Sequence, residues 1–142
     1  MSVYDAISPE EWLYENDHFF VIADRYPVSP GHLLIISKMN RRDYFDLSEA
    51  ERTALPEVIR KAKELILGMM INDFTEDMRS PGHDAPNAIP QKPDGYNIGM
   101  NCGEAAGQTI MHFHCHVIPR YKGDIPNPRG GIRHCIPGKG DY

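Results

Sequence analysis

The sequence predicts an α+β domain with an antiparallel sheet, because its segments follow the order strand, strand, helix, strand, strand. Residues 19–23 are apolar and residues 32–37 are rich in Leu and Ile, as in strands, and the short Ser-Pro-Gly turn between them favours an antiparallel hairpin. The 142 residues fit a single domain over 1–142. We expect its core over about residues 10–123, followed by a Pro- and Gly-rich tail over residues 124–142.

Two stretches carry helix signals. Ser8 and Pro9, followed by two glutamates, supply an N-cap, a first-turn proline and acids that suit a helix N-terminus, so we expect a short N-terminal helix. Ser48 and Glu51 form a capping box before a long stretch in which apolar residues recur at helical spacing. Pro56 inside this pattern predicts that the main helix kinks or restarts there.

The second half of the chain supplies two more strands. Residues 75–94 contain four prolines and few apolar side chains, so we expect an exposed loop there. Residues 96–101 and 108–118 have strand-like composition and are joined by a short turn that contains glycine. Beyond Pro119, proline and glycine dominate the tail, which favours turns over regular structure.

Composition argues against several classes of function. The formal net charge of −5 disfavours broad nucleic-acid binding, although a few local donors can still bind a small anion. Three cysteines without a Cys-x-x-Cys pair disfavour a disulfide framework or a cysteine-based zinc knuckle. The polar first residues lack a signal-peptide core, and the most apolar stretch, 65–71, is too short to cross a membrane. We therefore expect a cytoplasmic protein that binds neither nucleic acid nor membrane.

Residues 112–116 are His-Phe-His-Cys-His, so three imidazoles alternate with apolar side chains. Alternate side chains of a strand point to the same face, and we expect His112, His114 and His116 to share one face at a spacing of about 6.6–7 Å. The intervening residues would then face the core. Histidine titrates near neutrality, so this run calls for a chemical explanation.

Three explanations compete for this pattern. The histidines can occupy the solvent face of an amphipathic strand, which explains one such residue better than three. They can bind a metal, but no acidic residue follows His116 before Asp124, so the ligand set is incomplete. A neutral imidazole can also attack phosphorus and form a phosphohistidine, with neighbouring imidazoles that fix its tautomer and backbone donors that bind phosphate oxygens. Further ligands for a metal would have to come from His18, His32, His83 or His134.

The stretch 107–120 resembles the signature of the histidine-triad (HIT) superfamily of nucleotide hydrolases and transferases. The family pattern is His-φ-His-φ-His-φ-φ with φ apolar, and residues 112–118 satisfy it when Cys115 counts as a small hydrophobe. Upstream, residues 19–38 are similar to the family's nucleotide-binding hairpin, and residues 96–103 are similar to the strand before the triad. Together these matches cover most of the expected core.

The resemblance implies a HIT-like fold, in which a five-stranded antiparallel sheet carries a main helix and a short N-terminal helix. The pattern of residues alone gives four strands, so the fifth is implied by the resemblance. It also implies a homodimer.

By the same resemblance the histidines have different roles. His114 would be the nucleophile that takes a nucleoside monophosphate from the substrate. His116 would contact the scissile phosphate and help the leaving group depart. His112 and His32 would form a supporting set of hydrogen bonds.

Four further residues would bind the substrate. The resemblance implies that Gln108 and Thr109 bind phosphate oxygens, that Asn101 positions the phosphate, and that Asp24 accepts hydrogen bonds from the ribose. The apolar residues expected near the base include Phe20 and Ile22.

Local explanations also exist for three of these residues. Asp24 can be a turn acid, His32 a satisfied core histidine, and Asn101 a turn residue. With the triad present we favour the site for all three.

Three branches of the superfamily compete as interpretations of the motif. Dinucleoside polyphosphate hydrolases of the fragile-histidine-triad type share the Gly-Gln-Thr before the triad and the Pro-Arg after it, and both are present here. Hint-type phosphoramidases usually have Gly-Gln-Ser and lack the Pro-Arg ending. Diadenosine polyphosphate phosphorylases carry related triads.

We favour hydrolysis at the α-phosphate of a dinucleoside polyphosphate such as a diadenosine polyphosphate, through a covalent nucleotidyl-histidine. This chemistry requires no cofactor and no protein-bound metal, although Mg²⁺ can accompany the nucleotide. The alternatives of another class are a non-catalytic nucleotide-binding module and a metal-binding protein. In the tail, Arg129 or Arg133 would reach the polyphosphate if it is more than a solvated arginine.

Overall fold

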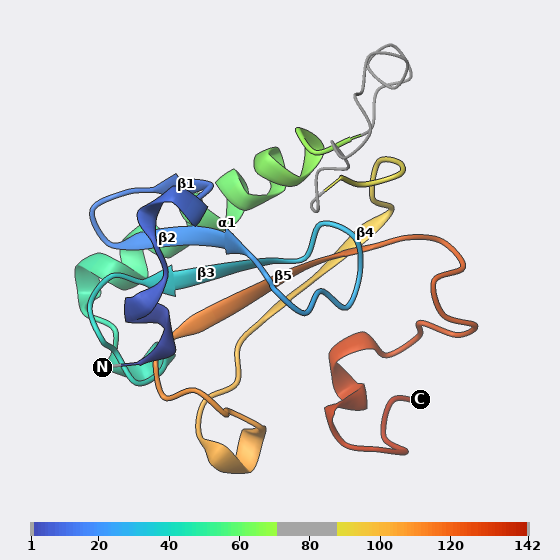
Figure 1. The fold of residues 1–142 in the computed structure, drawn as a ribbon. Helices are drawn as coiled ribbons and strands as arrows, with labels where there is room; N and C mark the ends of the chain where they lie inside the picture. The colour runs from blue at the N-terminus through green and yellow to red at the C-terminus, as the bar shows by residue number, and fades with distance from the viewer. Residues whose placement is uncertain (1, 71–87, 142) are drawn as a thin grey trace, which may run out of the picture.

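The computed structural model describes residues 2–70 and 88–141, which form a five-stranded antiparallel sheet with one main helix (Figure 1). The strand order is β1-β2-β3-β5-β4, and every neighbouring pair is antiparallel. The strands are β1 (Tyr14–Glu15), β2 (Phe19–Ala23), β3 (Leu33–Ser37), β4 (Gly95–Gly99) and β5 (His114–Arg120), and α1 spans Glu49–Leu67. The predicted α+β class, the hairpin of β2 and β3, and the fifth strand implied by the resemblance are confirmed.

Five short 3-10 helices complete the described elements. They are η1 (Val3–Ala6), η2 (Pro9–Glu11), η3 (Tyr44–Asp46), η4 (Glu104–Ala106) and η5 (Gly131–Cys135). The predicted short N-terminal helix is the single turn η2, capped by Ser8 as expected. The turn η1 before it was not predicted.

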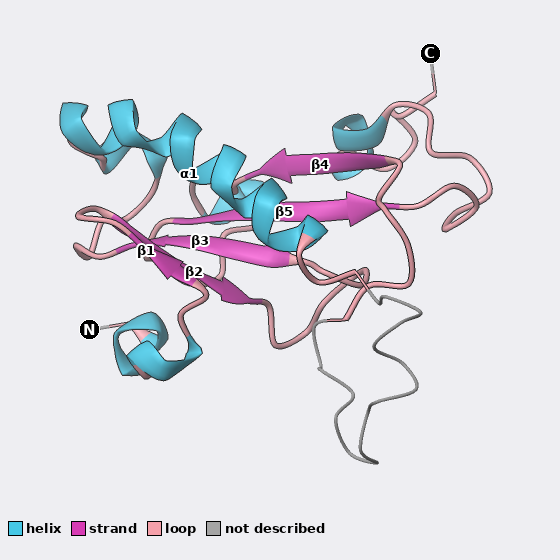
Figure 2. Cartoon of the chain, turned by 90° about the horizontal axis from the view of Figure 1, so that it is seen from above, coloured by secondary structure: helices cyan, strands magenta, loops and turns pink. Residues whose placement is uncertain are grey.

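The helix α1 covers one face of the sheet (Figure 2). The Ser48 side chain accepts from the Glu51 backbone N–H, and the Glu51 side chain accepts from the Ser48 backbone N–H, so the predicted capping box is confirmed. The expected restart at Pro56 is wrong, because α1 runs through this residue without interruption. Pro56 lies on the exposed side of the helix, where its ring meets solvent and the carbonyl that loses its partner can be hydrated.

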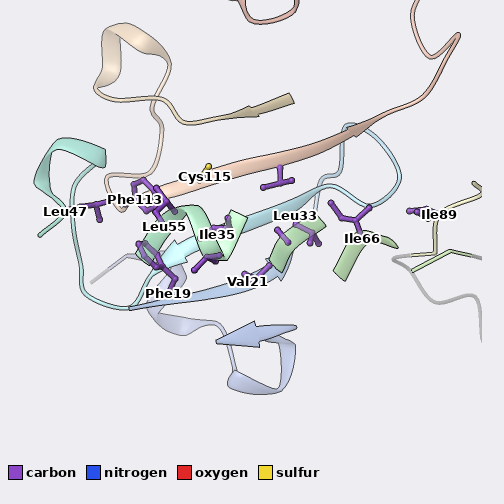
Figure 3. Close-up of a cluster of buried hydrophobic side chains, with 13 residues drawn as sticks. Phe19, Val21, Leu33, Ile35, Leu47, Leu55, Ile66, Ile89, Phe113 and Cys115 are labelled. Atoms are coloured by element: carbon purple, nitrogen blue, oxygen red, sulfur yellow. The ribbon is translucent and has the colours of Figure 1, made fainter. Parts of the chain in front are cut away.

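The main core lies between α1 and the sheet (Figure 3). It takes Phe19 and Val21 from β2, whose neighbours Phe20 and Ile22 face the other side of the sheet. The same alternation places Phe113, Cys115 and Val117 in the main core, as the sequence predicts for the residues between the histidines. Of the predicted loop over 75–94, residues 75–87 lie outside the described residues. The described part, 88–94, contains the fully buried Ile89.

A smaller apolar cluster covers the opposite face of the sheet, where the N-terminal segment crosses β2 and β3. Its buried members are Tyr4, Ile7, Phe20, Ile22, Leu34 and Ile36. The segment 2–7 is therefore part of the packed domain. Among residues 2–70 and 88–141, no helix has the length and apolar character needed to cross a bilayer.

Strand β5 is shorter than predicted at its start. The expected strand over 108–118 begins at His114, and residues 108–112 form bends and coil. Gly107 ends η4 with φ of +93°, and the Gln108 side chain bonds backbone groups of the turn in place of a neighbouring strand. His112 therefore precedes the strand, and only His114 and His116 share its regular alternation.

Candidate functional site

A pocket of about 430 Å³ opens on the sheet face opposite α1. Six of the eight predicted site residues line it, namely Asp24, His32, Asn101, Thr109, His114 and His116. Asp24 directly follows β2 and His32 directly precedes β3, Asn101 and Thr109 lie between β4 and β5, and the two remaining histidines belong to β5. Gln108 and His112 lie beside the pocket and do not line it. The fold thus gathers residues that are far apart in the sequence around one cavity.

The backbone of the triad fixes the protonation of His114. Its Nδ1 lies 2.8 Å from the carbonyl oxygen of His112. A carbonyl only accepts, so Nδ1 carries the proton and donates to it. In the neutral ring Nε2 then keeps its lone pair. His114 is a ring with one nitrogen held by the backbone and the other available as a base or nucleophile.

A second chain of hydrogen bonds fixes His116. The backbone N–H of Val28 donates to Nδ1 of His32 at 3.2 Å, so the neutral His32 carries its proton on Nε2. That Nε2–H lies 2.9 Å from Nδ1 of His116 and donates to it. His116 therefore carries its own proton on Nε2. Nε2 of His116 is therefore a hydrogen-bond donor, whereas Nε2 of His114 has a free lone pair.

Burial keeps both members of this pair neutral. The pKa of His116 is lowered to about 4, first by burial and then by the neighbouring His32 and His114. Burial also lowers the pKa of His32, although the nearby Asp24 carboxylate, 3.4 Å away, opposes the shift. Near neutral pH His32 therefore donates to His116, and the N–H that His116 can offer to a ligand is the one on Nε2.

The same hydrogen bonds bear on the metal alternative. One ligand atom each from Asp24, His32 and His116 lies within 4.8 Å of the others. A metal on Nε2 of His32 would move the proton to Nδ1, where it would face the Val28 N–H that now donates to that atom. The donor set therefore fits a hydrogen-bonded pair better than a metal centre.

The other histidines considered as ligands do not join this cluster. His18 and His134 are not part of it, and His83 lies outside the described residues.

His112 supports the site from behind, with only 1% of its surface exposed. Its Nε2 donates to the carbonyl of Ser37 at 2.7 Å, and its Nδ1 accepts from the Ser2 hydroxyl at 2.6 Å. The edge-on ring of Tyr4 contacts both His112 and His114, with centroid distances of 5.5 and 5.2 Å. The first triad histidine is thus held by both of its nitrogens.

Sequence reasoning missed Ser2 and Tyr4. Ser2 caps η1 in a capping box with Asp5, and Tyr4 is 7% exposed and lines the pocket. Burial, followed by the Asp24 charge, raises the pKa of Tyr4 to about 12, so its phenol stays protonated. A Ser-x-x-Asp pattern is a signal for a local cap, but nothing local indicates that this segment packs on the triad.

Gln108 organises the turn that carries the triad. Its Oε1 accepts from the Gly103 N–H at 2.7 Å, and its Nε2 donates to the carbonyls of Arg42 and Ile110 at 2.6 and 3.0 Å. The side chain is 4% exposed. The Gln108 amide is thus occupied by backbone groups, and the phosphate contact implied for it stays a prediction. Thr109 next to it does line the pocket.

The end of the pocket near β2 is apolar. Ile22, Leu34 and Ile110 line it, in keeping with the base end expected there. Phe20, also expected near the base, is not in the lining and stacks on Trp12 at 4.4 Å. Strand register does not separate Phe20 from the triad, because Phe20 and His114 both pair with Ile36, but the Phe20 ring is stacked by Trp12.

The contacts of Asp24 are compatible with both of its predicted roles, a turn acid and a site residue that binds the ribose. Its Oδ1 accepts from the Tyr26 N–H at 2.8 Å, as a turn acid does. Its Oδ2 faces His32 and the residue lines the pocket.

The two tail arginines lie away from this pocket. Neither Arg129 nor Arg133 is among its lining residues. The tail closes on itself, since Arg133 Nε donates to the Lys139 carbonyl and His134 Nε2 donates to the Arg129 carbonyl. Contact of these arginines with a polyphosphate therefore stays a prediction.

Comparisons with known proteins identify one family. The model of the HIT domain family matches residues 6–123. An uncharacterized HIT-like protein of Mycoplasma genitalium is 31% identical over 108 residues, which cover 76% of this chain and 62% of that protein. A Mycobacterium tuberculosis protein named AP-4-A phosphorylase is 27% identical over 106 residues, which cover 74% of this chain and 44% of that protein. The chain spans less than two thirds of the length of both relatives.

A solved structure supports the same fold. The crystal structure of a HIT family protein from Bacillus anthracis superimposes with a TM-score of 0.59 at 31% identity, over 80% of this chain and 66% of that chain.

Proposed function

The chain belongs to the HIT domain family, and we propose that it is an enzyme that hydrolyses dinucleoside polyphosphates at the α-phosphate. The observation that carries this proposal is the opposite protonation of two adjacent imidazoles. His114 has a free lone pair on Nε2 and His116 has a proton on Nε2, and their ring centroids are 5.5 Å apart. One ring can attack phosphorus while the other donates to an oxygen of the same phosphate.

The first step forms a covalent intermediate. The Nε2 lone pair of His114 attacks the α-phosphorus, and the N–P bond forms as the bond to the bridging oxygen breaks. The electron pair goes to that oxygen, and the Nε2–H of His116 stabilises it by a hydrogen bond. The proton on Nδ1 of His114 is held by the His112 carbonyl, which stabilises the positive charge that the ring acquires.

The second step regenerates the enzyme. Water attacks the same phosphorus, the N–P bond breaks, and its electron pair returns to Nε2 of His114. The proton of the water passes to solvent, and the nucleoside monophosphate leaves. Two displacements at one phosphorus predict that its configuration is retained.

The rest of the pocket suits the nucleoside. Asp24 and the apolar residues of β2 and β3 would hold the ribose and base, and Thr109 and Asn101 would contact the phosphate. We assign Gln108 and His112 the task of holding these groups in place.

A first test measures release of nucleoside monophosphate from diadenosine tetraphosphate by the wild type and by His114→Ala. We expect the variant to lose turnover by more than about 10⁴-fold while it still binds a nucleoside monophosphate. Near wild-type turnover by His114→Ala would refute the proposal.

The acceptor is tested in the same assay. Similarity to the AP-4-A phosphorylase makes inorganic phosphate a second acceptor to compare with water. We expect product formation without added phosphate, and an absolute requirement for phosphate would identify a phosphorylase. Adenosine phosphoramidate in a parallel assay tests the phosphoramidase alternative.

We also propose that two copies pair as a homodimer. Strand β4 forms an edge of the sheet, and its Ile98 is 41% exposed. Light scattering of the purified protein should give the mass of two chains, and the mass of one chain would contradict this.

A further inference from the structure

A second cavity, of about 380 Å³, lies on the same side of the sheet as the triad, farther along β5. Ile118 and Arg120 follow His114 and His116 at alternate positions of β5, so all four share one face of the strand. Asn97 of β4 is the register partner of Ile118 and also lines the second cavity. The second cavity therefore lies next to His116 on this face of β5, on the side away from His114.

The two cavities meet at the loop between β2 and β3. Val28 lines both of them. The Ser29 hydroxyl donates to the Pro119 carbonyl at 2.6 Å, and the Tyr121 hydroxyl donates to the Pro30 carbonyl at 2.7 Å. These two hydrogen bonds tie the loop to the end of β5, so the wall shared by the cavities is built before any ligand binds.

The main polar side chains of the second cavity are hydrogen-bonded to one another. Arg120 makes two hydrogen bonds to the Asp124 carboxylate, both of 2.8 Å, and a third to Oδ1 of Asn97 at 2.7 Å. The same guanidinium lowers the pKa of Asp124 below its usual range. With its charge balanced, Arg120 fixes the shape of the cavity and adds little net attraction for a phosphate.

What remains on the walls is apolar or aromatic. Val28, Pro30, Ile118 and Ile125 contribute aliphatic surface, and Tyr121 contributes an aromatic ring. A neutral, flat group with a sugar attached fits such a surface better than a chain of phosphates does.

The direction in which the leaving group departs indicates which part of a substrate would reach this cavity. In a displacement at phosphorus the leaving oxygen lies opposite the nucleophile, so it departs from His114 toward the donor His116. Beyond His116 on that face comes Ile118. Resting on the proposed function, we infer that the second cavity binds the nucleoside of the leaving group.

The test compares two substrates that differ only in the second nucleoside. They are diadenosine tetraphosphate and adenosine 5′-tetraphosphate, and adenosine 5′-phosphorofluoridate, whose leaving group is fluoride, serves as the baseline for nucleotidyl transfer. The variants are Ile118→Ala in β5 and Ile125→Ala in the loop after it, where folding is less at risk. Ile132→Ala is the matched control, because Ile132 is 62% exposed and lines neither cavity.

We expect the ratio of kcat/KM for diadenosine tetraphosphate to that for adenosine tetraphosphate to fall roughly five- to tenfold in both cavity variants. The control should keep the ratio of the wild type. An unchanged ratio in both variants, with a wild type active on all three compounds, would overturn this inference and leave the proposed function intact. A wild type that releases nucleoside monophosphate from none of the three compounds would overturn both.

Discussion

Nδ1 of His114 lies 2.8 Å from the carbonyl oxygen of His112, a residue only two positions earlier in the chain. This contact exists because His112 precedes the strand and His114 begins it. The backbone thereby selects the tautomer of His114 and turns its free nitrogen toward the pocket. The first histidine thus acts on the second through its main chain, while its own ring is held by Ser2 and Ser37.

The role of His116 predicts a dependence on the leaving group. His116→Ala removes the hydrogen bond to the departing oxygen, so we expect turnover of diadenosine tetraphosphate to fall by roughly 10²–10⁴-fold. The p-nitrophenyl ester of adenosine monophosphate leaves with its charge delocalised and needs this donor less. Steady-state assays should show a much smaller loss for the ester, whereas equal losses for both compounds would rule out this role.

Ser2 should matter for turnover although it is distant from phosphorus. Ser2→Ala removes the donor to Nδ1 of His112, and we expect kcat to fall roughly five- to tenfold with little change in KM. Ser2→Thr keeps the hydroxyl and should restore most of the rate. Equal kcat values for Ser2→Ala and the wild type would show that the N-terminal segment does not position the triad.

The lowered pKa of His116 predicts how stability depends on pH. In the unfolded chain this ring titrates near its ordinary value of 6.5, but in the fold it stays neutral down to about 4. The unfolded state therefore binds more protons between these values, and the free energy of unfolding should decrease as the pH falls from about 6.5 to about 4.

Denaturant titrations at pH 7.5 and pH 5 measure this effect. His116→Gln has no group that titrates there, so its difference between the two pH values should be smaller than that of the wild type. An equal or larger difference in His116→Gln would exclude His116 as the source.

Gly31 in the turn before β3 should tolerate no side chain. Its φ is +90°, and a Cβ there would lie 2.8 Å from Cγ2 of Ile89. Gly31→Ala should lower the free energy of unfolding by about 1–3 kcal/mol in denaturant titrations. Gly95→Ala is the control, because a Cβ at Gly95 meets nothing within 4 Å, and a similar loss there would argue against the steric explanation.

Local patterns predicted the parts of the structure that depend on local interactions. The apolar run of β2, the capping box of α1 and the alternation around Cys115 each follow from side chains that are neighbours along the chain. The pocket takes residues from β2, β3 and the turn before β5. Their grouping in one site was predicted only from the family resemblance, because no local rule relates Asp24 to Thr109.

The features that sequence reasoning missed depend on tertiary contacts. Ser2 bonds a histidine 110 positions away, and no period or motif indicates such a pair. The late start of β5 also has a tertiary cause, since the N–H of Phe113 bonds the carbonyl of Arg41, outside the sheet. Propensity alone extended the strand back to Gln108, whose amide is occupied within the turn.

The proposed mechanism depends most on the bond that Nε2 of His114 forms to phosphorus. The most direct measurement is rapid acid-free quenching of the wild type during turnover of diadenosine tetraphosphate, followed by proteolysis and mass spectrometry. We expect one adenylyl group on the peptide that contains residues 112–116, located at His114 and absent from His114→Ala. Turnover with no adduct on the protein, or an adduct located at another residue, would contradict it.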